Sequence, residues 1–143
     1  MTTRIKQEHK NGCGAASLAM ITGVSYADVI KHFSTIDFDK DGLIFDALIA
    51  FLVDNGFAVA PKFKYFSVVN SPGRNPWPPE PFADIHFCNV LVYEKSPMSH
   101  IVVMLKDGTI LDPLIDNISK ISDYFKVYNV TGIYCVKKLE SLK

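Results

Sequence analysis

The spacing of apolar and polar residues divides the chain into a helical first half and a strand-rich second half. Small residues and good helix formers fill residues 13–22, which predicts a helix there. Gly12 precedes this run and Gly23 follows it, and both are typical helix boundary residues. The density of alanine in this stretch indicates a helix that packs closely against another element.

Two further helices are predicted in the first half. Ser25 is a typical N-cap residue, and Asp28 three positions later favours a helix that continues to about Phe33. A third helix is expected over residues 43–54, and the Asn55-Gly56 pair supplies its end.

The second half contains extended and β-branched runs instead. They cover residues 58–69, 90–93, 100–105, 109–111 and 130–136. Lys106-Asp107-Gly108 is a hairpin signal between two of these runs. Helices followed by an antiparallel sheet predict an α+β fold, with the N-terminal helices packed on the C-terminal sheet. The length of 143 residues suits one domain over residues 1–143.

Residues 71–82 hold five prolines and Trp77, so no regular structure is expected there. A loop of this length in a small domain is often functional. It is interpreted either as a lid or wall beside a cleft, or as a rigid connector.

Composition and charge narrow the classes of function. The chain has 15 basic and 15 acidic residues and 48% hydrophobic residues, which is typical of a folded globular domain. A zero net charge disfavours a general nucleic-acid or anionic-membrane binder. No apolar stretch is long enough for a membrane span or a signal peptide, so a cytoplasmic location is expected. Oligomeric state and bacterial or phage origin stay open.

Cys13 is the candidate nucleophile. It begins the first predicted helix, whose N-terminus favours the thiolate, and Gly12 and Gly14 leave the sulfur uncrowded. The other cysteines are Cys88 and Cys135, and an odd count without a CxxC pair predicts free thiols in a reducing compartment.

His100 is the candidate base, because a histidine at the start of an apolar strand needs a role or a partner. Asp112, followed by Pro113, interrupts the next strand. A three-residue loop at 106–108 would put Val102 opposite Asp112, so that His100 and Asp112 share one face of the sheet. A two-residue loop would point His100 to the other face. The His–Asp pair therefore requires the three-residue loop.

Acyl transfer also needs hydrogen-bond donors for the oxyanion. The backbone N–H of Cys13 is one candidate. Gln7, six residues earlier, is the candidate for a side-chain donor. Asn11 is the competitor, but it is expected to be too close in sequence to fold back over the sulfur.

Taken together, these residues resemble a known family. The pattern Gln7-x5-Cys13-Gly14-x-Ala16-x-Leu18-x-Met20, then His100-Ile-Val-Val, then Asp107-Gly108-x-Ile-Leu-Asp112-Pro113 is similar to the papain-like peptidases that process bacteriocin and double-glycine leader peptides. The resemblance implies a papain-like fold with Cys13 as nucleophile, His100 as base and acid, Asp112 as orienting group and Gln7 in the oxyanion hole. Members often carry an acidic residue before the cysteine, where this chain has Gly12. Many are fused to an ABC transporter.

The predicted activity is hydrolysis of a peptide bond in a peptide or protein substrate, by a thiol protease that uses no metal or cofactor. One alternative keeps the triad but makes the protein an acyltransferase or a glutamine deamidase. Another is a non-catalytic module that binds a peptide in the cleft.

Two patterns in the sequence suggest metal sites, one for calcium and one for zinc. Asp37, Asp39 and Asp41 have the opening spacing of an EF-hand calcium loop, but Leu48 stands where the bidentate glutamate is required. The simpler interpretation is an acidic turn, and calcium binding stays open. His86-x-Cys88, with Cys135, lacks the paired spacing of a structural zinc site.

Overall fold

The computed structural model describes residues 3–64, 85–93, 97–116, 118–120, 123–124 and 128–139. Three helices precede five strands, which confirms the α+β expectation. The helices are α1 (Cys13–Thr22), α2 (Tyr26–His32) and α3 (Phe45–Asp54). The strands are β1 (Phe57–Lys64), β2 (Ile85–Tyr93), β3 (Pro97–Leu105), β4 (Ile110–Leu111) and β5 (Asn129–Lys138). The predicted loop over residues 71–82, with Trp77, lies outside the described residues.

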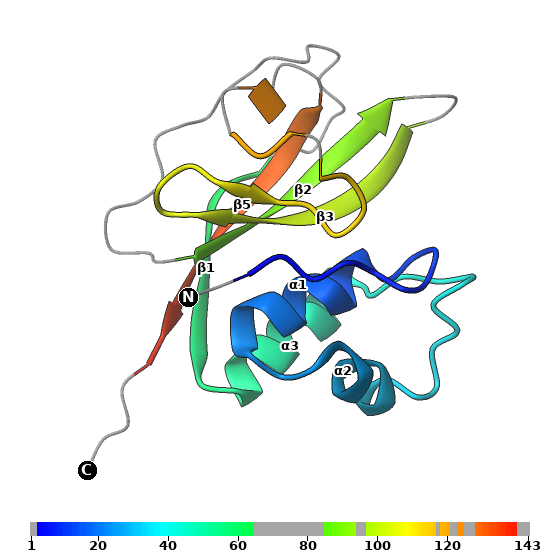
Figure 1. Cartoon of the computed structure of the whole chain (residues 1–143). Helices are drawn as coiled ribbons and strands as arrows, with labels where there is room; N and C mark the ends of the chain where they lie inside the picture. The colour runs from blue at the N-terminus through cyan, green and yellow to red at the C-terminus, as the bar shows by residue number, and fades with distance from the viewer. Residues whose placement is uncertain are drawn as a thin grey trace.

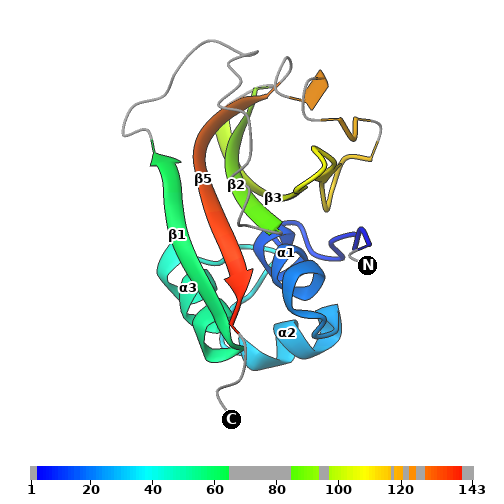
Figure 2. The ribbon, with the colours of Figure 1, turned by 90° about the vertical axis from the view of Figure 1, so that its left-hand side faces the viewer.

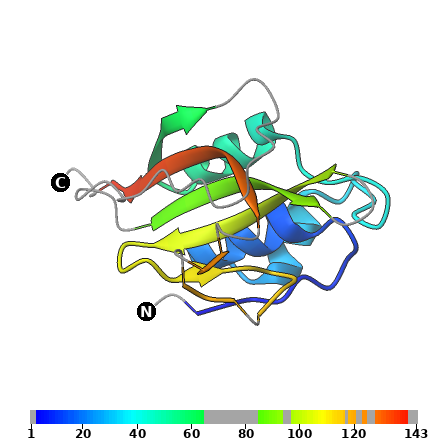
Figure 3. The same ribbon diagram turned by 90° about the horizontal axis from the view of Figure 1, so that it is seen from above.

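The strands form one curved antiparallel sheet in the order β1-β5-β2-β3-β4. The last strand, β5, is inserted between β1 and β2 and pairs with both (Figure 2). The helices lie together on one side of this sheet, with α1 beneath the strands (Figures 1 and 3). The sheet and α1 thus come together at the end of α1 that carries Cys13.

Helix α1 is central because its side chains are small. Ala15, Ala16 and Ala19 are at most 1% exposed, and they let the helix approach β3 closely. Residues 14–21 are all buried, since α2, α3 and the sheet surround the helix. The predicted boundaries are confirmed: Gly12 is the N-cap, and Gly23 ends the helix with φ of 80°.

The hairpin that joins β3 to β4 has the three-residue loop. Val103 pairs with Leu111 and Met104 with Ile110, which places Val102 opposite Asp112. Gly108 has φ of 90°, the left-handed conformation that this loop requires. The two-residue register is excluded, and the predicted shared face for His100 and Asp112 is confirmed.

Some element boundaries differ from those predicted. His100 does not begin its strand, because β3 starts at Pro97 and His100 pairs with Val90 of β2 inside the ladder. Strand β2 starts at Ile85 rather than Val90, since polar residues in its first half break the apolar pattern. The ladder between neighbouring strands, rather than local hydrophobicity, decides where these strands begin.

No helix among the described residues is both long and apolar enough to cross a bilayer alone. Helices α1 and α2 would qualify by length and composition only as a pair, and they meet at a bend of 117°.

Candidate active site

Cys13 is the first residue of α1, so its thiol lies at the positive end of the helix dipole. Its side chain is partly exposed at the cleft. Burial raises the pKa of the Cys13 thiol, but hydrogen bonding and charge from His100, with backbone groups of Ile101 and Gly14, lower it below the usual 9.0 overall. The site therefore favours the thiolate, which is the reactive form of cysteine.

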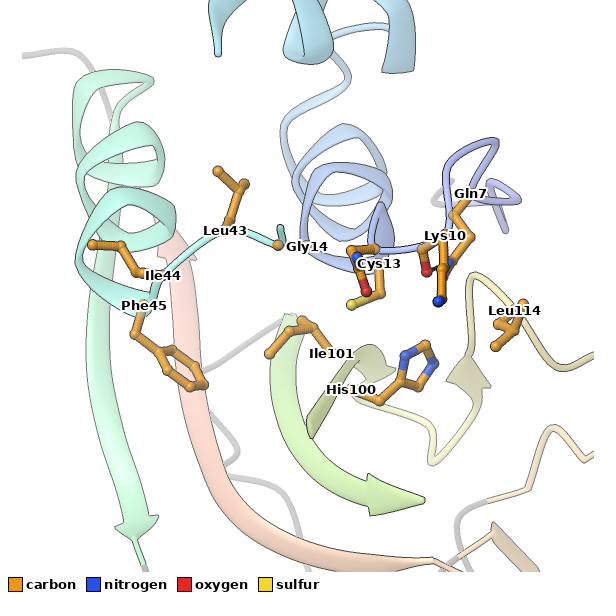
Figure 4. Close-up of a pocket in the computed structure, with 12 residues that line it drawn as sticks. Gln7, Lys10, Cys13, Gly14, Leu43, Ile44, Phe45, His100, Ile101 and Leu114 are labelled. Atoms are coloured by element: carbon orange, nitrogen blue, oxygen red, sulfur yellow. Dashed lines mark hydrogen bonds between the residues drawn. The ribbon is translucent and has the colours of Figure 1, made fainter. Parts of the chain in front are cut away.

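His100 projects from β3 toward the sulfur (Figure 4). It is 5% exposed, and its Nε2 atom lies 2.6 Å from Oδ1 of Asp112. With Nε2 donating to Asp112, Nδ1 is the ring atom left for the thiol. Burial lowers the pKa of His100, but hydrogen bonds and charge from Asp112 and Cys13 raise it to about 9. The imidazole is thus cationic at neutral pH, and its charge favours ionisation of the Cys13 thiol.

Asp112 is 1% exposed and receives several hydrogen bonds besides that of His100. Its Oδ1 accepts from the N–H groups of Leu114 (2.9 Å) and Ile115 (3.1 Å). Its Oδ2 accepts from the Tyr124 hydroxyl at 2.7 Å. Burial raises the pKa of this carboxyl, but His100, the Leu114 N–H and the Tyr124 hydroxyl lower it overall. Asp112 is therefore held as a carboxylate in a fixed orientation.

Tyr124 is a member of this network that the sequence did not reveal. Its side chain is fully buried. Nothing in the pattern around residue 124 distinguishes this tyrosine from an ordinary core aromatic, because its partner Asp112 comes from a different part of the chain.

Gln7 lies at the same cleft, but its amide is already engaged. Nε2 donates to the carbonyls of His9 and Lys10, both at 3.0 Å. A primary amide has two hydrogens, so both are used. The Oε1 atom is buried and has no hydrogen-bond partner in the described structure. The structure thus brings Gln7 to the site with its N–H groups holding the loop, and the oxyanion role stays a prediction.

The same loop is tied down at three further points. Gln7 N–H donates to Pro113 O at 2.9 Å, which joins the loop to the strand end that carries Asp112. The Tyr26 hydroxyl accepts from Glu8 N–H at 3.2 Å and is 2.8 Å from His9 Nδ1. The segment before Cys13 is therefore fixed by both the sheet and α2.

Gly12 leaves room for the Tyr26 side chain. A Cβ atom at position 12 would clash with the Tyr26 hydroxyl and would lie 3.3 Å from His9 O. A side chain at position 12 would have to displace the Tyr26 hydroxyl.

A cleft of about 500 Å³ runs past Cys13 and His100. Figure 4 shows apolar side chains on one side of the sulfur and Gln7, Lys10 and Leu114 on the other. Asn11, the competitor for the side-chain donor, also lines the cleft. The lining residues are Gln7, Lys10, Asn11, Cys13, Gly14, Gly42, Leu43, Ile44, Phe45, His100, Ile101 and Leu114.

The candidate calcium ligands Asp37, Asp39 and Asp41 belong to a turn. Asp37 Oδ1 accepts from Asp39 N–H at 3.1 Å, and Asp39 Oδ1 accepts from Lys10 N–H at 3.2 Å. Among the residues that the structure describes, no three His, Cys, Asp or Glu side chains are grouped to hold a metal. Two of the candidate zinc ligands, His86 and Cys135, are opposite one another in the backbone register of β2 and β5.

Cys13 at the N-terminus of α1 therefore faces the buried His100–Asp112 pair of the antiparallel sheet. Over 98% of its length the chain superposes on the whole peptidase domain of Streptococcus ComA, a bifunctional ABC transporter involved in a quorum-sensing pathway, with a TM-score of 0.58 and 13% sequence identity. No family model matches the chain, and no curated protein matches its sequence. The resemblance noted in the sequence is thereby confirmed at the level of the fold.

Proposed function

We propose that the protein is a cysteine peptidase that cleaves a peptide bond with Cys13 as nucleophile. The observation that carries the proposal is the meeting of three side chains from separate segments: Cys13 on α1, His100 on β3 and Asp112 after β4. The fold alone does not require a cysteine, a histidine and an aspartate at these three positions. The lowered pKa of Cys13 and the raised pKa of His100 favour the thiolate and the imidazolium that the chemistry needs.

The reaction follows from this geometry. The Cys13 thiolate attacks the carbonyl carbon, and the Cys13 N–H at the start of the helix stabilises the oxyanion. The C–N bond then breaks as His100 gives its proton to the leaving amine, which leaves a thioester on Cys13. Water, deprotonated by His100, attacks the thioester and releases the carboxylic acid. Asp112 holds the imidazole and stabilises its charge throughout.

Selective alkylation is the first test. Iodoacetamide is expected to modify Cys13 faster than Cys135, which is buried, and pre-treatment is expected to abolish turnover. Equal labelling of the two, or labelling of Cys13 with full retained activity, would contradict the proposal. Cys135→Ala is the matched control and should keep both labelling and activity.

The reaction type needs a separate measurement. Mass spectrometry of a peptide mixture treated with the wild type and with Cys13→Ala separates cleavage, a one-dalton gain from deamidation and an acyl adduct. We expect cleavage products that the Cys13→Ala sample lacks.

A further inference from the structure

The cleft has two unlike sides. Leu43, Ile44 and Phe45 make one of them apolar. On the other side of the sulfur lie Lys10 and Leu114, next to His100 (Figure 4). Three ionisable side chains line the described cleft, namely Cys13, His100 and Lys10.

The reaction chemistry determines in which direction a bound peptide runs across the cleft. The amine leaves from the carbon that Cys13 attacks, and it must receive its proton from His100. The residues that follow the scissile bond therefore lie on the His100 side, against Lys10 and Leu114. The residues that precede it lie toward the apolar side.

Two hydrogen bonds hold the backbone of Lys10, whereas its side chain is exposed. Its N–H donates to Asp39 Oδ1 at 3.2 Å, and its carbonyl accepts from Gln7 Nε2 at 3.0 Å. Its exposed side chain makes no ion pair with any residue that the structure describes.

The cleft presents one exposed charge to a peptide on this side. The Cys13 thiolate, the His100 imidazolium and the Asp112 carboxylate sum to one negative charge, but Asp112 is 1% exposed and does not line the cleft. The Asp39 carboxylate keeps its charge while it accepts the Lys10 N–H, and it does not line the cleft either. The ammonium of Lys10 is thus the exposed charge that lines this side of the cleft.

We infer that Lys10 selects peptides with Asp or Glu at the first or second position after the scissile bond. The inference rests on the proposed peptidase function and adds its substrate preference. An exposed ammonium–carboxylate pair changes kcat/KM by about two- to fivefold, since such pairs are weak in water. The preference is screened by salt because the Debye length falls from about 10 Å at 0.1 M to about 3 Å at 1 M.

A peptide library prepared from a digested proteome tests this inference. It is incubated with the wild type, Lys10→Glu, Lys6→Glu and Cys13→Ala, and the new amino termini are labelled and sequenced. Lys6 is exposed and does not line the cleft, so Lys6→Glu makes the same charge change outside the site. Synthetic peptides that differ only in Glu or Lys after the cleaved bond then give kcat/KM at low and high salt.

Enrichment of Asp and Glu after the cleaved bond is expected for the wild type and Lys6→Glu. Lys10→Glu is expected to favour Lys and Arg there, and both preferences should weaken in 1 M salt. Cys13-dependent cleavage without a charge preference, or with one that Lys10→Glu does not change, would overturn the inference and leave the peptidase proposal standing. No Cys13-dependent cleavage in the library would count against both.

Discussion

His100 donates from Nε2 to Oδ1 of Asp112 over 2.6 Å, and both side chains are buried. This bond orients the imidazole so that Nδ1 is directed to the sulfur of Cys13. Because the partners are twelve residues apart, only the correct hairpin register brings them together. The catalytic proposal therefore depends on a loop conformation as much as on residue types.

The Asp112→Asn and Asp112→Ala variants separate orientation from charge. Asparagine can keep Oδ1 toward His100 and turn its NH2 to the Tyr124 hydroxyl, so the fold should survive while the stabilising charge is lost. We expect Asp112→Asn to lower kcat/KM by up to about 10⁴-fold, the scale of the equivalent change in a serine protease. Alanine leaves buried donors unpaired and should also lower the free energy of unfolding by about 3–5 kcal/mol.

Steady-state kinetics and urea denaturation measure the two effects. Equal activity in the wild type and Asp112→Asn would show that the carboxylate charge is unimportant. Asp116→Asn is a suitable control, because Asp116 is an exposed acid on the same segment.

Activity should follow a bell-shaped dependence on pH. On the acid side, kcat/KM rises as Cys13 ionises, and interaction with His100 places that pKa below 9.0. On the alkaline side, kcat/KM falls as His100 loses its proton, at about pH 9. The Asp112→Asn variant should move the alkaline limb to lower pH. An unmoved alkaline limb in that variant would contradict the role of Asp112 in raising the pKa of His100.

Stability should also depend on pH through His100. Its pKa rises from 6.5 in the unfolded chain to about 9 in the folded protein, so its stabilising effect is complete below pH 6.5 and is lost as pH rises toward 9. The Cys13→Ala background removes the opposing contribution of the thiol. There, the free energy of unfolding should fall as pH rises above 6.5, over a narrower window than in the wild type, because Cys13 no longer helps to raise the pKa of His100. Adding His100→Gln should remove that part of the pH dependence, which urea titrations between pH 6 and 9 would reveal.

Local sequence signals predicted the parts of this structure that local physics controls. Gly12, Gly23 and the Ser25 cap determine the helix ends. Lys106-Asp107-Gly108 predicted the hairpin but left two registers open, and the structure has the three-residue loop, which brings His100 and Asp112 to one face. The strand starts were predicted less well, because they depend on pairing with distant strands.

The contacts that complete the site could not be predicted for the same reason. Tyr124 meets Asp112, and Tyr26 meets the loop before Cys13, only through tertiary packing. The engaged hydrogens of Gln7 follow from the path of its own loop, which residue type does not specify. A sequence pattern identifies residues suited to a reaction, whereas their hydrogen-bond partners require coordinates.

The effects of substitutions at Gly12 and Tyr26 on stability should be strongly coupled. Gly12→Ala puts a methyl group against the Tyr26 hydroxyl, so we expect a loss of about 1–3 kcal/mol in stability and a fall in activity as the loop shifts. Tyr26→Phe alone loses the hydrogen bonds to Glu8 and His9 but frees that space. The double variant should be less destabilised than the sum of the two changes. Additive effects in thermal unfolding would refute the clash.

Gln7 offers a test of two distinct roles. As an oxyanion donor, it would affect kcat by about 10²–10³-fold while leaving stability unchanged. Its amide hydrogens, however, are donated to the carbonyls of His9 and Lys10, so we expect Gln7→Ala to lower both kcat and the melting temperature. Gln7→Glu should be worse for stability at neutral pH, because a carboxylate would face the same two carbonyls without hydrogens to donate. A loss of kcat with unchanged melting temperature in both variants would show that Gln7 gives up its loop contacts during turnover and acts on the oxyanion.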